Sequence, residues 1–146
     1  MKSMSKMVLY IGLAIVLIGI IIGVYFFTLG QKDLTNAKAD YVLTARELYA
    51  DFEKDEDAAN HKYVDKILEV SGPVFQVDMN TDSTLNVVLM NKEDFGGVSC
   101  SFNTLKDPSS IDISKGDLVV IRGICAGYLL PDVLLNNCVI VGTPMP

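Results

Sequence analysis

"RGICAGYLLPDVLLNNCVIV", residues 122–141, contains two apolar runs on either side of Pro131-Asp132. Proline at the second position of a type I turn, with aspartate after it, is a common combination. The stretch therefore predicts a β-hairpin with Pro131 and Asp132 at the centre of its turn. In that register, counting outward along the two strands places Cys125 opposite Cys138.

The three cysteines, Cys100, Cys125 and Cys138, allow three interpretations. Directly opposed residues have Cβ atoms about 4.5–5.5 Å apart, and a disulfide needs ~3.8 Å, so a modest adjustment would allow a Cys125–Cys138 disulfide. The sequence favours this bridge, which would stabilise an extracytoplasmic domain by ~2–4 kcal/mol. A Cys100–Cys125 bridge is the alternative. In the third interpretation all three cysteines are small buried hydrophobes. A turn displaced by one residue would send the hairpin cysteines to opposite faces.

Further strand patterns lie upstream of the hairpin. The strands are "KILEVSGPVFQVDM" (66–79), "TLNVVLM" (84–90), "GGVSCSF" (96–102), "LVVIRGICAGY" (118–128) and "VLLNNCVIV" (133–141). They are rich in β-branched residues, and the first is long and interrupted by Gly72-Pro73, which predicts a bend. Five such strands predict a mainly β fold, a five-stranded OB-fold Greek-key barrel over residues 66–146.

The amino-terminal part contains an uncharged run of 23 residues, 7–29. As a helix it would span about 34 Å, enough for a bilayer core of ~30 Å, so it predicts a single transmembrane signal anchor. A cleaved signal peptide is the rival, but its apolar region is usually shorter, ~7–15 residues. Lys2 and Lys6 precede the run and indicate a cytoplasmic segment 1–6 and an outward carboxy-terminal domain. Gly19 and Gly23 match the spacing of helix packing, which would give a homo-oligomer, although glycine is common in membrane helices.

The segment between the anchor and the barrel reads as a linker, 30–36, followed by helices over 37–65. Apolar residues recur three and four apart through 34–52, which predicts an amphipathic helix with Thr35 as its N-cap. A short second helix is expected around 57–63. Within it, Asn60 and Lys62 are predicted to tie the helix to the first barrel strand while Tyr63 packs beneath.

Two motifs carry a resemblance to a known family. They are DE-x-AAN-x-KY at 55–63 and GxCxG at 123–127 followed by Asn137-Cys138. Over roughly 41–141 the chain resembles the bacterial tRNA-anti-like OB-fold family, whose members are often lipoproteins or membrane-anchored. The chain differs in having a membrane span in place of a lipobox cysteine. The resemblance implies an OB-fold and kinship to anticodon-binding barrels. The predicted anchor places such a bacterial protein in the inner membrane.

The net charge and the motifs disfavour several classes of function. With Lys2 and Lys6 set aside, ten basic residues face eighteen acidic ones, a balance of −8, which repels polyanions such as nucleic acid. The lone His61 and the acidic run 53–57 lack the spacing of metal or catalytic sites, so neither a cofactor nor an enzymatic activity is predicted. We expect a non-enzymatic, membrane-anchored envelope module that binds or scaffolds a protein or small ligand. A nucleic-acid-binding OB domain is the alternative.

Overall fold

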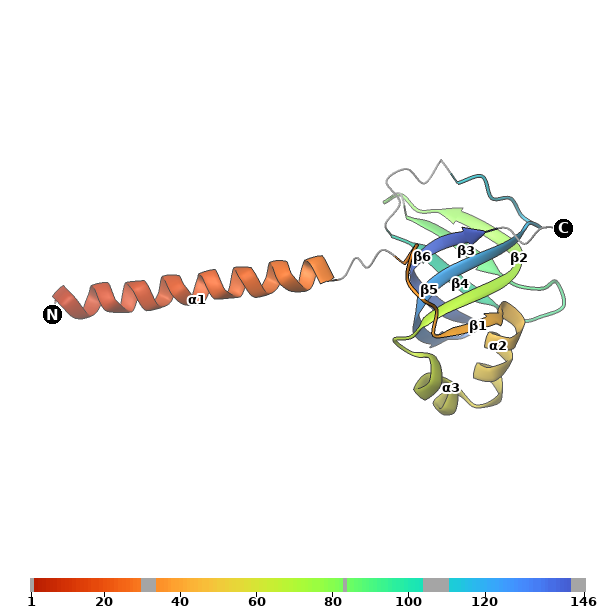
Figure 1. Ribbon diagram of the computed structural model, residues 1–146, viewed down its shortest axis with the longest axis horizontal. Helices are drawn as coiled ribbons and strands as arrows, with labels where there is room; N and C mark the ends of the chain where they lie inside the picture. Colours follow the sequence, from red (N-terminus) through yellow and green to blue (C-terminus); the bar gives the residue numbers. More distant parts are fainter. Residues whose placement is uncertain (1, 30–33, 83, 104–110, 143–146) are drawn as a thin grey trace. The chain divides into compact units, whose positions relative to one another are not determined.

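A closed barrel forms the carboxy-terminal unit of the chain (Figure 1). The computed structural model describes residues 2–29, 34–82, 84–103 and 111–142. Its elements are α1 (Lys2–Leu29), β1 (Tyr41–Thr44), α2 (Ala45–Lys54), α3 (Glu56–Tyr63), β2 (Ile67–Met79), β3 (Leu85–Leu89), β4 (Val98–Phe102), β5 (Leu118–Leu129) and β6 (Asp132–Gly142). The strand order β2-β3-β4-β6-β5 returns to β2, which closes five strands and confirms the predicted OB-fold barrel.

The long strand β2 takes part in both halves of the barrel. Its residues 67–73 pair antiparallel with β5, and residues 74–79 pair with β3. The change of partner falls at Gly72-Pro73, where the sequence predicts a bend. A Cβ at Gly72 would lie 3.1 Å from the Ala45 Cβ, so this glycine lets the start of α2 pack closely on the bend.

The barrel core follows from alternation along the strands. β3 and β4 alternate strictly between buried and half-exposed positions, so every second side chain enters the interior. The interior is apolar and includes all three cysteines. Burying an aliphatic side chain contributes about 1.5–3 kcal/mol relative to exposing it, so this packing holds the five strands together.

The two short helices add an aromatic layer to the same core. Phe52 of α2 stacks on Tyr128 of β5, with ring centroids 5.7 Å apart, and lies 6.0 Å from the Tyr63 ring of α3. Ala59 and Tyr63 of α3 are buried as well. The hydrophobic core therefore extends from the barrel into α2 and α3.

The helix predicted from residue 37 begins later than expected. Residues 41–44 form β1, which pairs parallel with β2, and α2 starts at Ala45. Thr44, and not Thr35, is the N-cap: its hydroxyl accepts from the Glu47 N–H at 3.2 Å, and the Glu47 carboxylate accepts from the Thr44 N–H at 2.8 Å. This capping box fixes the helix start. The spacing of Tyr41 suited either structure, and pairing with the free edge of β2 decided in favour of the strand.

The amino-terminal unit, residues 1–32, consists of α1. Residues Met4–Phe27 form a helix that is long and apolar enough to cross a membrane, by length and composition. A signal sequence would have the same features. Part of the predicted linker, 30–33, lies outside the described residues.

Candidate functional site

The β5–β6 hairpin differs from its predicted register. Leu129 pairs with Asp132, so Leu130 and Pro131 form the turn, and the peptide bond between them is cis. The pairing is irregular between Cys125 and Gly127, and as a result Leu135 faces Cys125. The predicted pairing of Cys125 with Cys138 is therefore wrong, and the predicted disulfide is not formed: all three cysteines are free and buried.

The thiols lie in the barrel interior, where Cys100 and Cys138 come from neighbouring strands. A hydrogen bond with Cys138, together with burial, holds the pKa of the Cys100 thiol well above its ordinary value. Burial also raises the pKa of Cys125. Thiolates are the reactive form of cysteine, so burial and a raised pKa disfavour nucleophilic reactivity of Cys100 and Cys125.

Two of the residues predicted to dock the second helix on the first barrel strand, Lys62 and Tyr63, contact α2 and Tyr41 of β1. The Tyr63 hydroxyl donates to the Asp51 carboxylate, and burial raises the pKa of Tyr63. The Lys62 ammonium lies 3.6 Å from Asp51 and 4.7 Å from the Tyr63 ring centroid. Asn60 lies near Gly127, whose Cβ, if present, would be 3.8 Å from the Asn60 amide oxygen. This arrangement joins α2 to α3.

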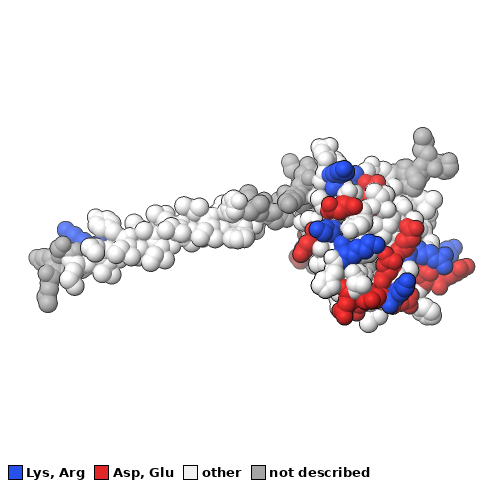
Figure 2. Space-filling view, turned by 60° about the horizontal axis from the view of Figure 1, so that its bottom comes forward, with Lys and Arg blue, Asp and Glu red and all other residues white. Residues whose placement is uncertain are grey.

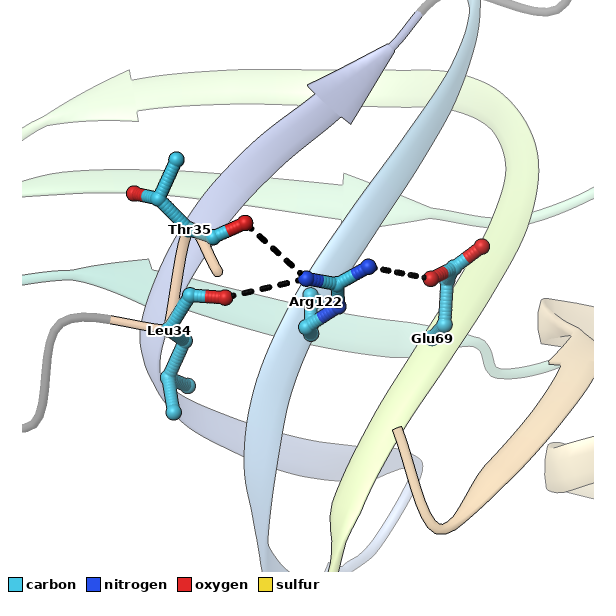
Figure 3. Close-up of polar contacts among 4 residues, drawn as sticks. All are labelled: Leu34, Thr35, Glu69 and Arg122. Carbon is cyan, nitrogen blue, oxygen red and sulfur yellow. Dashed lines mark hydrogen bonds and ion pairs between the residues drawn. The ribbon is translucent and has the colours of Figure 1, made fainter. Parts of the chain in front are cut away.

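Arg122 holds the start of the carboxy-terminal unit on the barrel (Figure 3). One guanidinium nitrogen donates to the carbonyl oxygens of Leu34 and Thr35, each at 3.1 Å, and the other donates to Glu69 at 2.8 Å. Arg122 and Glu69 are 13% and 22% exposed, so little water screens the ion pair. No local sequence pattern predicts this cluster, because only the β2–β5 register brings Arg122 opposite Glu69.

A groove lies beside the bend of β2. It comprises two adjoining hollows of about 410 and 400 Å³ that share Arg46, Pro73 and Asn91. We call it the Pro73 groove. Lys92 and Lys115 line one hollow, and the Lys115 ammonium lies 4.7 Å from the Phe75 ring centroid. A groove with cations beside an aromatic ring can accept an acidic group, although Glu93 also lines it. These cations are far apart in the sequence, so composition alone gave no sign of the cluster.

The outer face of β3 and β4 differs from a surface for single-stranded nucleic acid. Its half-exposed side chains are Asn86, Val88, Ser99 and Ser101, and none of the four is cationic or aromatic. The Ser101 hydroxyl lies 2.7 Å from the Asn86 amide oxygen. Nucleic-acid binding by stacking needs aromatic side chains and a cationic groove. Figure 2 shows acidic and basic side chains interspersed on one face of the barrel unit.

The two glycines predicted to pack helices together, Gly19 and Gly23, lie in α1. A Cβ added at Gly19 or Gly23 would meet nothing within 4 Å, so helix packing through these glycines remains a prediction. Among the residues that the structure describes, no group of three or more His, Cys, Asp or Glu side chains could hold a metal ion.

Comparison with known proteins identifies relatives of the sequence and of the fold. A sequence model of the tRNA_anti-like family matches residues 1–139. No curated protein matches the chain. A lipoprotein structure from Klebsiella pneumoniae, whose name proposes nucleic-acid binding, has a TM-score of 0.56 and 15% identity, covering 68% of this chain and 90% of that chain.

Two further structures match less closely. A protein from Leishmania major named as an aspartyl-tRNA synthetase has a TM-score of 0.47 and 12% identity over 78% of this chain and 23% of its own. The yeast Stn1 and Ten1 structure has a TM-score of 0.43 and 13% identity over 74% of this chain and 65% of that chain.

Proposed function

Because the chain belongs to the tRNA_anti-like family, we propose that it is a non-enzymatic OB-fold binding module of the bacterial cell envelope. Its ligand is an acidic group on a protein or small molecule, held in the Pro73 groove. The observation that carries this proposal is the presence of Lys92 and Lys115 in one groove of a domain whose net charge is strongly negative. Arg46 also lines the groove and lies 3.8 Å from Asp94. Such local charge gives an acidic ligand a preferred place of contact.

Membrane anchoring is the second part of the proposal. The helix Met4–Phe27 has the length of a span. Lys2 and Lys6 precede its uncharged part, which begins at Met7, and no acidic residue accompanies them. The positive-inside rule then places the barrel unit on the extracytoplasmic side of the inner membrane.

Photocrosslinking in native membranes tests the ligand site. A photoreactive residue at Leu118, an exposed and uncharged residue that lines the groove, should capture a specific species. Lys115→Glu should reduce its yield severalfold because it reverses a charge of the groove. Lys66→Glu is the matched control, since Lys66 is an exposed lysine in the turn before β2. Equal capture in both variants would contradict the groove as the binding site.

Cysteine labelling in intact cells tests the orientation. The native cysteines are buried and serve as an unlabelled background. A membrane-impermeant thiol reagent should label a Glu56→Cys variant, whose site is exposed, and should label Ser5→Cys only after permeabilisation. The reverse pattern would place the barrel in the cytoplasm.

Nucleic-acid binding is a second candidate, which the name of the Klebsiella lipoprotein favours. The net charge of −8 outside the amino-terminal lysines and the neutral face of β3 and β4 oppose it. Binding of oligonucleotides that weakens steeply with salt would establish it, because neutralising each phosphate releases counterions. Lys115→Glu would then lower the slope of that salt dependence by about one.

A further inference from the structure

Hydrogen bonds join the loop before β4 to the β5–β6 turn in the barrel unit. The Gly97 N–H donates to the Asp132 carboxylate at 2.9 Å, and the Val133 N–H donates to the Gly97 carbonyl at 2.9 Å. Gly96 lies so close to the hairpin turn that an added Cβ would clash with the Pro131 carbonyl oxygen. The loop before β4 and the β5–β6 turn therefore form one protrusion.

The exposed side chains of this protrusion are apolar. Phe95 is 93% exposed, Leu129 is 68% exposed and Leu130 is 78% exposed, and Pro131 beside them is also exposed. We call these four residues the barrel tip. Large apolar side chains gathered on adjacent turns mark an interaction surface, since single exposed residues are normal but clusters are not.

The carboxylates next to the barrel tip are occupied by contacts within the protein. Asp132 accepts from the Gly97 N–H, as described above. Asp94 accepts from the Asn91 amide at 3.0 Å and lies 3.8 Å from Arg46. Desolvating the barrel tip therefore does not require burying either carboxylate without a partner. Glu93 and Lys92 are exposed nearby and are of opposite charge.

The chain keeps a bilayer within reach of the barrel unit. Leu34 is completely buried, and Arg122 holds its carbonyl, so the barrel unit is fixed from this residue onward. Only residues 30–33 separate Leu34 from the end of α1 at Leu29, and five extended residues span at most about 18 Å. A tether of this length gives the bilayer a high effective concentration around the domain.

We propose that the barrel tip inserts into the headgroup boundary of the bilayer that holds α1. The inference rests on the membrane anchoring proposed above. Phenylalanine and leucine bury in this boundary region. The negative barrel unit is repelled by anionic lipid, so apolar burial and not charge drives the contact. A protruding tip also fits a deformable lipid surface, and neither hollow of the Pro73 groove includes its residues.

A single fluorophore can test this contact, because the chain contains no tryptophan. The full chain with Phe95→Trp is reconstituted in phosphatidylcholine nanodiscs, with or without bromine on the acyl chains near the headgroup. Its emission should shift to the blue, and the brominated lipid should quench most of it. Met79→Trp is the matched control. Met79 is 58% exposed and lies at the end of the β2–β3 pair away from Leu89 and the loop that contains Phe95. Its tryptophan should show neither the blue shift nor the quenching.

Each outcome separates anchoring from tip insertion. Loss of the parent chain from the discs in an alkaline wash would refute the anchoring. A retained chain whose two tryptophans are quenched equally, or not at all, would overturn the tip contact. A blue shift that appears only with two copies per disc and without quenching would assign the tip to a second copy and also overturn it. Leu130→Trp must reproduce the quenching of Phe95→Trp, and both variants must keep the parent's circular dichroism.

Discussion

Replacing Arg122 with methionine isolates the contribution of the cluster that fixes the barrel unit to the chain leading from α1. The substitution removes three hydrogen bonds and leaves Glu69, 22% exposed, without its cation. Breaking a buried ion pair by removing one partner costs ~3–5 kcal/mol. Because Glu69 keeps some contact with water, we expect about 3 kcal/mol of lost unfolding free energy, at the low end of that range. At about 4 °C per kcal/mol for a domain of this size, the melting temperature falls by about 12 °C.

Urea unfolding of the full chain in detergent, followed by far-ultraviolet circular dichroism, measures this loss. Glu69→Leu and the double variant complete a thermodynamic cycle. Since an apolar pair in place of an ion pair is often nearly neutral, the double variant should be more stable than the sum of the single losses predicts, by about 1–3 kcal/mol. Trypsin should also cleave Arg122→Met faster at Lys38, which is exposed just beyond the held residues.

Two results would refute this reasoning. The first is an Arg122→Met variant within about 0.5 kcal/mol of the parent, the range of ordinary surface substitutions. The second is additivity of the two single losses, which would show that the Arg122–Glu69 ion pair carries no coupling. Unchanged cleavage at Lys38 in a destabilised variant would separate barrel stability from the hold on Leu34.

Further substitutions test the helices, the hairpin and the thiols, all by urea unfolding of the full chain. Tyr63→Ala should cost about 3–5 kcal/mol, because it empties a buried aromatic site, and Tyr63→Phe about 1 kcal/mol for its hydrogen bond to α2; equal losses would contradict a packing role. Gly123→Ala should cost about 1–3 kcal/mol, since its Cβ would lie 2.7 Å from the Cys138 sulfur, whereas Gly142→Ala, which meets nothing within 4 Å, should be neutral. Above about pH 9 stability should fall, because the folded state keeps the Cys100 proton that the unfolded chain releases; the slope approaches about 1.4 kcal/mol per pH unit, and Cys100→Ala should reduce it.

Local patterns were sufficient to predict the barrel. Alternation in β3 and β4, and the glycine-proline bend in β2, each specify a strand from a few neighbouring residues. Closure of the sheet then follows from the number of strands and the long first one. The start of α2 was predicted wrongly because residues 41–44 can join either a helix face or a sheet edge, and only the unpaired edge of β2 distinguishes the two.

The contacts of the sites depend on register and on distance in the sequence. The hairpin register was wrong because the turn is centred on Leu130 and Pro131, one residue earlier than predicted, and irregular pairing between Cys125 and Gly127 shifts the register again. Arg122 and Glu69 are 53 positions apart, and the Pro73 groove collects its cations from three separate segments. No local pattern contains such pairs.

Because the three thiols are buried, their redox state does not indicate on which side of a membrane the domain lies. The sequence linked an oxidising environment to a hairpin disulfide, so free thiols would have indicated a cytoplasmic domain. In the structure all three side chains lie in the apolar interior, and the pKa values of Cys100 and Cys125 are raised. Thiol oxidation needs access and thiolate character, so these cysteines can stay reduced on either side of a membrane. The proposed orientation of the domain therefore rests on the charges that flank α1 and not on the redox state of the cysteines.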